Sequence, residues 1–226
     1  MGERLAVVAG AGGPLGRAVA AKLADTGYGV VGIDRNEDGL RLLAQGVRRV
    51  TGDPADPAAA RTLIDAVAAE SGPPDVLVNT IGAFALGEAL TVTPDDLRRM
   101  MDVNAGAALW LTQAVVPHMR QRGSGAIVHV SARPSLEPTA GMAAYGLSKA
   151  ALSQLVRILD LELRPQGIRV NAVAPQLIDT PKNREFLPPD AMTHAVTPEA
   201  IAEVIAFLAS DASAPVSGAV LPAYGA

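Results

Sequence analysis

Short apolar segments that alternate with helical segments are the feature that most constrains the fold of this 226-residue chain. A first apolar run, LAVVAG at residues 5–10, ends in glycines, and a helical pattern follows from Leu15 to about Thr26. The alternation continues, with expected strands at 29–34, 47–50, 75–79, 125–131, 168–174 and 219–221 and expected helices at 38–45, 57–70, 93–121, 143–163 and 198–210. Apolar strands separated by helices pair in parallel, with helices covering both faces. We therefore expect one α/β domain over residues 1–226, a doubly wound parallel sheet of about seven strands.

Composition and charge exclude several classes of function. The formal net charge is −4 and basic residues form no cluster, so we expect no nucleic-acid partner. The absence of cysteine excludes disulfides, a thiolate nucleophile and cysteine-type zinc sites. His118, His129 and His194 include no pair at i, i+4 spacing, so we expect surface or packing roles and no metal site. The N-terminus lacks a signal-peptide pattern, and no segment approaches the ~18 apolar residues of a membrane span, so we expect a cytoplasmic protein without a membrane partner.

The glycine-rich segment AGAGGPLG, residues 9–16, joins the first expected strand to the first expected helix. Glycines there let the backbone turn tightly and approach a pyrophosphate, whose charge the helix N-terminus stabilises. Asp34 closes the second expected strand about 20 residues later, where a carboxylate binds the ribose hydroxyls of adenosine. Packing is the alternative explanation for the glycines, and a helix N-cap is the alternative for Asp34. We favour a dinucleotide site in a Rossmann fold.

Two adjacent residues bear on which nicotinamide cofactor is bound. A carboxylate at Asp34 repels a 2′-phosphate, which favours NAD(H). Arg35 follows directly, and its guanidinium is suited to bind a 2′-phosphate. The sequence therefore favours NAD(H) and leaves NADP(H) open.

Tyr145 and Lys149, in the segment AAYGLSKAAL, are the expected catalytic pair. They lie one helical turn apart on the same face. A tyrosine with a pKa near ~10 exchanges protons poorly at neutral pH, and a nearby lysine cation favours the phenolate and lowers that pKa. The lysine ammonium is also able to hydrogen-bond the nicotinamide ribose. The alternative is a surface i, i+4 polar pair, because the pattern is short.

The motifs around this pair decide between the two explanations, because over its whole length the chain resembles the short-chain dehydrogenase/reductase family. AGAGGPLG stands where that family has TGxxxGxG, NTIG at 79–82 where it has NNAG, and DVN at 102–104 where an asparagine supports a proton relay to the lysine. RVNAVAP at 169–175 precedes LIDTP. The resemblance implies Tyr145, Lys149 and Asn104 as catalytic residues. It implies cofactor contacts at Gly10, Gly13, Leu15, Gly16, Asp34, Arg35, Asp53, Pro54, Asn79, Thr80, Ile81, Tyr145, Lys149, Pro175, Ile178 and Thr180.

The chain departs from the family pattern at its catalytic serine. That serine stands thirteen residues before the tyrosine, and here the position is Ala132. Ser131 precedes it on the strand and is expected to point away from the pocket, since side chains alternate along a strand. Ser135 lies in the following loop and is the nearer candidate to replace the missing hydroxyl. Pro14 replaces a glycine of the first motif, which costs little if it opens the helix.

The stretch ARPSLEPTAGMAAYGLSKAAL at residues 132–152, followed by DTPKNREFLPPDA at 179–191 and TPEA at 197–200, is similar to quinonoid dihydropteridine reductases. Those proteins also lack the serine, and they reduce an imine-like substrate with NADH. The expected function is therefore an NAD(P)(H)-dependent oxidoreductase that transfers a hydride between nicotinamide and a small carbonyl, imine or quinonoid substrate. Tyr145 would be its acid/base. The alternatives are a dinucleotide-binding protein with a regulatory or assembly role, and a redox-neutral isomerase or dehydratase on the same scaffold. The resemblance also implies a short substrate lid at 181–197 and a homodimer or homotetramer.

Overall fold

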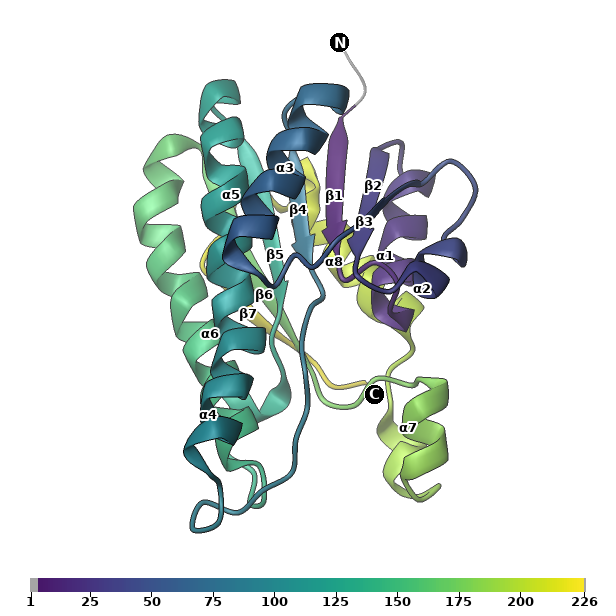
Figure 1. The fold of residues 1–226 in the computed structure, drawn as a ribbon, viewed down its shortest axis with the longest axis vertical. Helices are drawn as coiled ribbons and strands as arrows, with labels where there is room; N and C mark the ends of the chain where they lie inside the picture. The colour runs from purple at the N-terminus through teal and green to yellow at the C-terminus, as the bar shows by residue number, and fades with distance from the viewer. Residues whose placement is uncertain (1–3, 226) are drawn as a thin grey trace.

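Seven parallel strands form the central sheet of the protein, in the order β3-β2-β1-β4-β5-β6-β7 (Figure 1). The structure is a computed structural model and describes residues 4–225. The strands are β1 (Leu5–Ala9), β2 (Gly29–Asp34), β3 (Arg48–Thr51), β4 (Val76–Asn79), β5 (Gly125–Val130), β6 (Ile168–Pro175) and β7 (Val220–Ala223). The helices are α1 (Pro14–Asp25), α2 (Glu37–Arg41), α3 (Pro57–Ser71), α4 (Pro94–Met101), α5 (Ala107–Arg122), α6 (Ala143–Leu163), α7 (Pro181–Phe186) and α8 (Pro198–Ala209). The strand order reverses between β1 and β4, which confirms the expected doubly wound sheet.

Each face of the sheet has its own apolar core. Successive residues of β1 point to opposite faces, so Val8 packs with α1 and α8 while Val7 packs with α3, α5 and α6. Figure 1 shows these helices in two layers, one on either side of the strands. Because both faces are covered, the strands are apolar at nearly every position, and this is why they are readable in the sequence.

The long helix expected at 93–121 is not regular, and this corrects the prediction. It begins as expected, with Thr93 as the N-cap and a capping box that includes Asp96. Between α4 and α5, however, residues Asp102–Gly106 form one π-helical turn. The Ala107 N–H bonds the Asp102 carbonyl, which widens the helix there. This turn carries Asn104, which is fully buried. Its side chain bonds Ser148 of α6 and the Ala83 carbonyl in the loop after β4, so tertiary contacts stabilise the irregular turn.

The helix expected at 38–45 is also shorter than predicted, since α2 ends at Arg41 and the chain continues in turns that bury Leu43. The expected strands at 47–50 and 219–221 are shifted by one or two residues. All other expected elements are present at close to their expected bounds.

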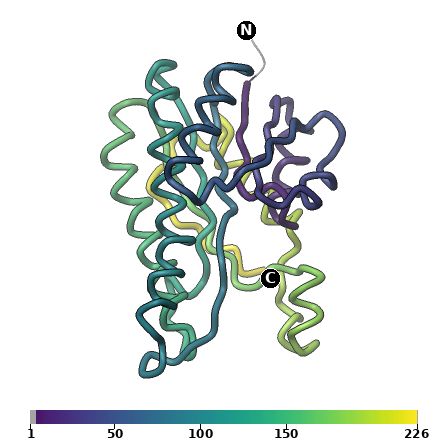
Figure 2. The backbone as a smooth tube through the Cα atoms, viewed as in Figure 1, coloured from purple at the N-terminus to yellow at the C-terminus, as the bar shows by residue number. Residues whose placement is uncertain are grey.

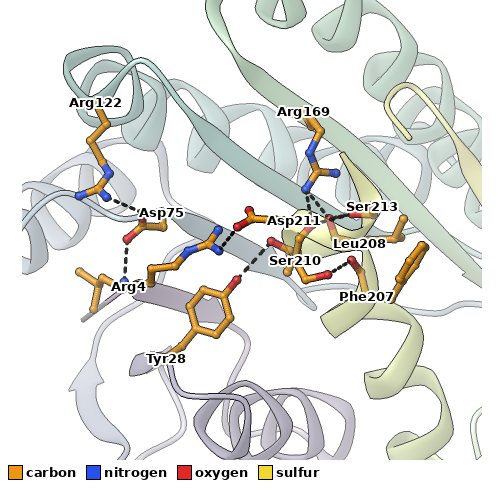
Figure 3. A network of polar contacts seen from close by, with 12 residues as sticks. Arg4, Tyr28, Asp75, Arg122, Arg169, Phe207, Leu208, Ser210, Asp211 and Ser213 are labelled. Atoms are coloured by element: carbon orange, nitrogen blue, oxygen red, sulfur yellow. Dashed lines mark hydrogen bonds and ion pairs between the residues drawn. The ribbon is translucent and has the colours of Figure 1, made fainter. Parts of the chain in front are cut away.

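A network of buried polar contacts holds the amino ends of the strands (Figure 3). The Asp75 carboxylate accepts a hydrogen bond from the Leu5 N–H at 2.8 Å and pairs with Arg122 at 2.6 Å. The half-buried guanidinium of Arg169 donates to the carbonyls of Leu208, Ser210 and Val216, at 3.0, 3.0 and 3.2 Å. These contacts fix the C-terminal end of α8 against the sheet. The polar cluster described next lies at the opposite, carboxyl edge.

Within residues 4–225, no helix has the length and apolar character needed to cross a membrane.

Candidate active site

The glycine-rich turn between β1 and α1 packs so closely against neighbouring backbone that larger residues would collide with it. Gly10 has φ +81°, and a Cβ added there would lie 2.6 Å from Thr80 Oγ1. A Cβ on Gly16 would collide with the Gly10 carbonyl oxygen. Gly13 is the N-cap of α1, and Pro14 opens the helix as expected. The turn leads directly into the N-terminus of α1, and helix N-termini are sites that bind pyrophosphate.

The Asp34 side chain, at the end of β2, hydrogen-bonds this turn. Its carboxylate accepts hydrogen bonds from the Gly12 N–H and the Asn36 N–H, both at 2.9 Å. The N-cap of α2 is Asn36, so the alternative role of Asp34 as a helix cap is wrong. Arg35 points away from the turn: its side chain is 77% exposed and lies 3.3 Å from Asp53.

The segment after β4, residues 79–83, connects the glycine-rich turn to Asn104 and through it to α6. Thr80 Oγ1 lies 3.0 Å from the carbonyls of both Ala9 and Gly10, to which it donates. The Asn79 side chain accepts from the Ile81 N–H at 3.0 Å. At the other end, Ala83 forms two hydrogen bonds with the Asn104 side chain, each 3.0 Å long. This segment is therefore held on both sides by residues predicted from the sequence.

The α6 helix carries Tyr145 and Lys149 to the same edge of the sheet. Lys149 is buried, and its Nζ donates to the Val130 carbonyl at 2.9 Å. Asn104 donates from its Nδ2 to Ser148 Oγ at 3.0 Å. A Cβ on Gly82 would lie 3.0 Å from Asn104 Oδ1 and 3.1 Å from Lys149 Nζ, so Gly82 is the spacer between these two side chains. The surface-pair alternative for Tyr145 and Lys149 is wrong because the lysine is inside the protein.

Burial sets the acidity of the pair, and it corrects one expectation. Desolvation raises the pKa of Tyr145 to about 12, and it lowers the pKa of Lys149 to about 8. The expectation that Lys149 lowers the pKa of Tyr145 is therefore wrong for the protein chain alone. The physical reason is that burial disfavours the charged form of both groups, while the ammonium is engaged by the Val130 carbonyl.

No serine takes the place of the missing hydroxyl at Ala132. Ser131 points away, as expected: its Oγ lies 2.7 Å from Ser153 Oγ and donates to the Lys149 carbonyl at 3.2 Å. The Oγ of Ser135, the other candidate, lies 3.0 Å from Ser131 Oγ and 2.8 Å from Ser153 Oγ. Ser153 is eight residues beyond Tyr145, about 12 Å along the helix. The hydroxyls of Ser131, Ser135 and Ser153 therefore contact one another beside the middle of α6.

The remaining predicted residues lie at the same carboxyl edge. Pro175 ends β6 opposite Ala223 of β7, and Thr180 caps α7 by accepting from the Asn183 N–H at 3.2 Å. Ile178 pairs with Val196, which closes the segment 180–195 into a loop containing α7. Leu15, Pro54 and Ile81 contribute buried or half-buried side chains around the glycine-rich turn and the ends of β3 and β4.

Three residues at the same edge as Tyr145 and Lys149 were missed in the sequence. Phe84 is 58% exposed and meets Tyr145 edge-to-face, with ring centroids 5.0 Å apart. Arg133, directly after Ala132, lies 5.0 Å from the ring centroid of Tyr224. The Tyr224 hydroxyl is buried and has no hydrogen-bond partner within the described part of the chain. The C-terminal strand reaches this edge beside the segment that carries α7 (Figure 2), and contacts at Gly225 with His194 and Val196 agree. The rarity of aromatic residues in this chain marked Phe84 and Tyr224, and nothing in the sequence marked Arg133.

Across residues 4–225 no group of three or more His, Asp or Glu side chains is arranged to hold a metal ion. His129 and His118 have packing and surface partners: His129 is fully buried next to Asn79, and His118 lies 2.8 Å from Asp65.

Comparisons with known proteins agree with this geometry. Residues 10–225 match a family model described as enoyl-(acyl carrier protein) reductase. The chain is 36% identical to galactitol 2-dehydrogenase of Rhizobium johnstonii, over 97% of this chain and 93% of the relative. It is 31% identical to 4-formylbenzenesulfonate dehydrogenase of Comamonas testosteroni, over 100% and 98%. A solved structure from Burkholderia xenovorans, assigned to the short-chain dehydrogenases/reductases, superposes with a TM-score of 0.91 at 29% identity, covering 98% of this chain and 95% of the other.

Proposed function

Because the chain belongs to the short-chain dehydrogenase/reductase family and is thus an NAD(P)-dependent oxidoreductase, we propose that it is an NADH-dependent reductase of a small carbonyl, imine or quinonoid compound. The observation that supports the proposal is that the buried side chains of Asn104 and Lys149 lie on either side of Gly82, with Tyr145 one helical turn from Lys149 and alanine at position 132. When bound, the nicotinamide supplies the hydride.

The residues present fit a dinucleotide. Gly10 and Gly16 let the turn fold tightly against its own backbone, and at Gly13, the N-cap of α1, a Cβ would have only the Gly10 carbonyl oxygen near it, at 3.5 Å. Gly10, Gly13, Leu15 and Gly16 would surround the pyrophosphate, and Asp53, Pro54 and the segment 79–81 would surround the adenosine. Pro175, Ile178 and Thr180 would hold the carboxamide. Each of these contacts is part of the proposal.

The electrostatics of the turn favour NAD(H) over NADP(H). The Asp34 carboxylate is fixed at the end of β2 by two main-chain N–H groups, where it would repel a 2′-phosphate. Arg35 is turned toward Asp53 and would have to leave that partner to bind the phosphate. We expect a higher kcat/KM with NADH than with NADPH. Asp34→Ser should reduce this preference at least tenfold, and equal rates of the wild-type enzyme with both cofactors would contradict the assignment.

The high pKa of Tyr145 suits a proton donor. A phenol with a pKa of about 12 is fully protonated at neutral pH, so Tyr145 Oη would give its proton to the substrate oxygen or nitrogen. Lys149, with a pKa of about 8, still carries its proton at pH 7. Asn104 would hold the relay that returns a proton to this pair. Lys149 Nζ would also bind the nicotinamide ribose.

The absence of a serine hydroxyl limits how strongly the site polarises a ketone. An imine or quinonoid substrate needs proton delivery more than it needs a second hydrogen-bond donor on oxygen. We expect wild-type enzyme with NADH to reduce quinonoid dihydropterin faster than a panel of simple ketones. Ala132→Ser should raise kcat/KM for ketones about tenfold and change the quinonoid rate little. No oxidation of NADH or NADPH by any compound would refute the reductase proposal.

We also propose that residues 181–197 form the substrate lid and that the enzyme is a homodimer or homotetramer. Exposed apolar side chains on α6, Ile158 at 44% and Leu161 at 74%, support association of subunits. Light scattering coupled to gel filtration tests this directly, and a monomer at micromolar concentration would contradict it.

A further inference from the structure

His129 is a buried titratable residue to which the proposed mechanism gives no task. It lies on β5 and is fully buried. Its ring bridges two elements: Nδ1 is 3.4 Å from Asn79 Nδ2, after β4, and Nε2 is 3.2 Å from Thr112 Oγ1, on α5. A histidine in a strand core is costly unless both nitrogens are satisfied, as they are here.

The partners determine which nitrogen carries the proton. Thr112 Oγ1 donates its one hydrogen to the Ala108 carbonyl at 2.8 Å, so it must accept from the ring. Nε2 is therefore the protonated nitrogen. Nδ1 then carries no proton and accepts a hydrogen bond from Asn79 Nδ2, because an amide nitrogen can only donate.

The same chain of hydrogen bonds orients Asn79. With its Nδ2 given to His129, the Asn79 Oδ1 faces the other way and accepts from the Ile81 N–H at 3.0 Å. The hydrogen bonds run in one direction, from Ile81 through Asn79, His129 and Thr112 to Ala108. Burial and the charge of Lys149 lower the pKa of His129 to about 3, which keeps this single tautomer neutral.

This arrangement anchors one end of residues 79–83. The other end is tied to Asn104 through Ala83, and Thr80 in the middle is tied to the turn at Gly10. Reversal of the Asn79 amide would leave the Ile81 N–H facing a donor. His129 Nδ1 and the Ile81 N–H together fix the orientation of the Asn79 amide.

We propose that His129 is a positioning residue that holds residues 79–83 in the shape that binds the dinucleotide, through its Nδ1 bond to Asn79. The proposal rests on the dinucleotide site proposed above. It makes the two nitrogens of His129 unequal: the bond to Asn79 serves the cofactor, and the bond to Thr112 serves the fold.

Two substitutions, each of which preserves the hydrogen bond of one ring nitrogen, separate the effects of Nδ1 and Nε2. In His129→Asn the side-chain oxygen takes the place of Nδ1 and still accepts from Asn79. In His129→Gln the amide nitrogen takes the place of Nε2 and still donates to Thr112. The NADH dissociation constant, measured by cofactor fluorescence, should stay within about threefold of wild type for His129→Asn. It should rise about tenfold for His129→Gln, the size expected when a buried amide loses its partner.

The readouts distinguish positioning from packing. For His129→Gln, KM for NADH should rise while kcat with the best panel substrate stays within about twofold. His118→Gln and His118→Asn, at a surface histidine paired with Asp65, are the matched controls and should leave the dissociation constant unchanged. Equal affinities of the two His129 variants, or losses that follow their melting temperatures, would overturn the proposal.

Nitrogen-15 NMR of the wild-type protein tests the hydrogen-bond chain without any substrate. The His129 signals should show the Nε2–H tautomer and should not titrate between pH 5 and pH 8, because its pKa is about 3. An Nδ1–H tautomer or titration in that range would overturn the proposal. Wild-type protein that binds NADH but reduces no compound would refute only the reductase proposal. Wild-type protein that binds neither cofactor would refute both.

Discussion

Replacing Gly82 with alanine is the sharpest test of how the side chains of Asn104 and Lys149, proposed above as catalytic, are spaced. The added Cβ would lie 3.0 Å from Asn104 Oδ1 and 3.1 Å from Lys149 Nζ, whereas ordinary van der Waals contact begins at 3.4 Å. The two atoms must therefore retreat by about 0.4 and 0.3 Å, since contact needs full atomic radii. Neither side chain is free to do so easily, because both are buried and hydrogen-bonded.

The expected effect on stability is small. Weakening the bond from the Ala83 N–H to Asn104 costs about 1 kcal/mol. Replacing glycine by alanine at a position without positive φ returns about 0.4–1 kcal/mol by restricting the unfolded chain. The two nearly cancel, so the melting temperature should change by only a few degrees.

The expected effect on catalysis is larger. A displacement of ~1 Å costs on the order of 100-fold in rate, so a displacement of a few tenths should lower kcat about tenfold. The NADH dissociation constant should rise severalfold, because Lys149 Nζ moves from the proposed ribose site. Initial rates of NADH oxidation with the best panel substrate, cofactor fluorescence and calorimetry measure the three quantities.

Gly146→Ala is the matched control. Gly146 lies next to Tyr145 on α6, and the nearest atoms to an added Cβ belong to Pro134, at 3.8 and 3.9 Å, which is ordinary contact. This variant should gain stability by about 0.5–1 kcal/mol from helix propensity and keep kcat within twofold. A Gly82→Ala enzyme with the kcat of Gly146→Ala would refute the reasoning, as would a Gly82→Ala protein that loses kcat only because it unfolds.

Three further predictions follow from the same contacts. Gly16→Ala should abolish NADH binding and lower the unfolding free energy, measured by calorimetry, by more than about 3 kcal/mol. The added Cβ would meet the Gly10 carbonyl and Ala11 Cα, which are backbone atoms that cannot move aside. Wild-type affinity for NADH would contradict this and would show that α1 shifts to accommodate the Cβ. The pKa of Lys149 falls from 10.5 to about 8 on folding, so between these pH values the unfolded chain binds a proton that the folded protein lacks. The free energy of unfolding of the wild-type protein, measured by urea titration, should therefore rise from pH 8 to pH 10.5. Lys149→Met should lack this rise. Tyr224→Phe should raise the melting temperature, because it removes a buried hydroxyl that has no hydrogen-bond partner within the described part of the chain. A lower melting temperature would show that the hydroxyl does have a partner and would point to Glu137, whose charge, after burial, raises the pKa of Tyr224.

Much of the fold is readable from local patterns, for a physical reason. Strands such as β1 are covered on both faces, so every residue must be apolar, and the turn after β1 must contain Gly10 and Gly16 because the backbone approaches itself there. Tyr145 and Lys149 stand one helical turn apart in any α-helix, so their shared face needs no tertiary information. The short-chain dehydrogenase/reductase family is therefore evident before any contact is known.

Tertiary contacts decided what local patterns do not encode. The π-helical turn at Asn104 exists because Ala83 and Ser148 satisfy its side chain, and both are distant in sequence. The acidity of Tyr145 and Lys149 depends on how deeply they are buried, and the orientations of Ser131 and Ser135 depend on Ser153. The sequence by itself determined which chemical groups reach the carboxyl edge of the sheet, because helix and strand periodicity place them there. Only the folded chain determined their protonation, their spacing across Gly82 and the role of His129, because desolvation and hydrogen-bond direction arise between residues that meet only on folding.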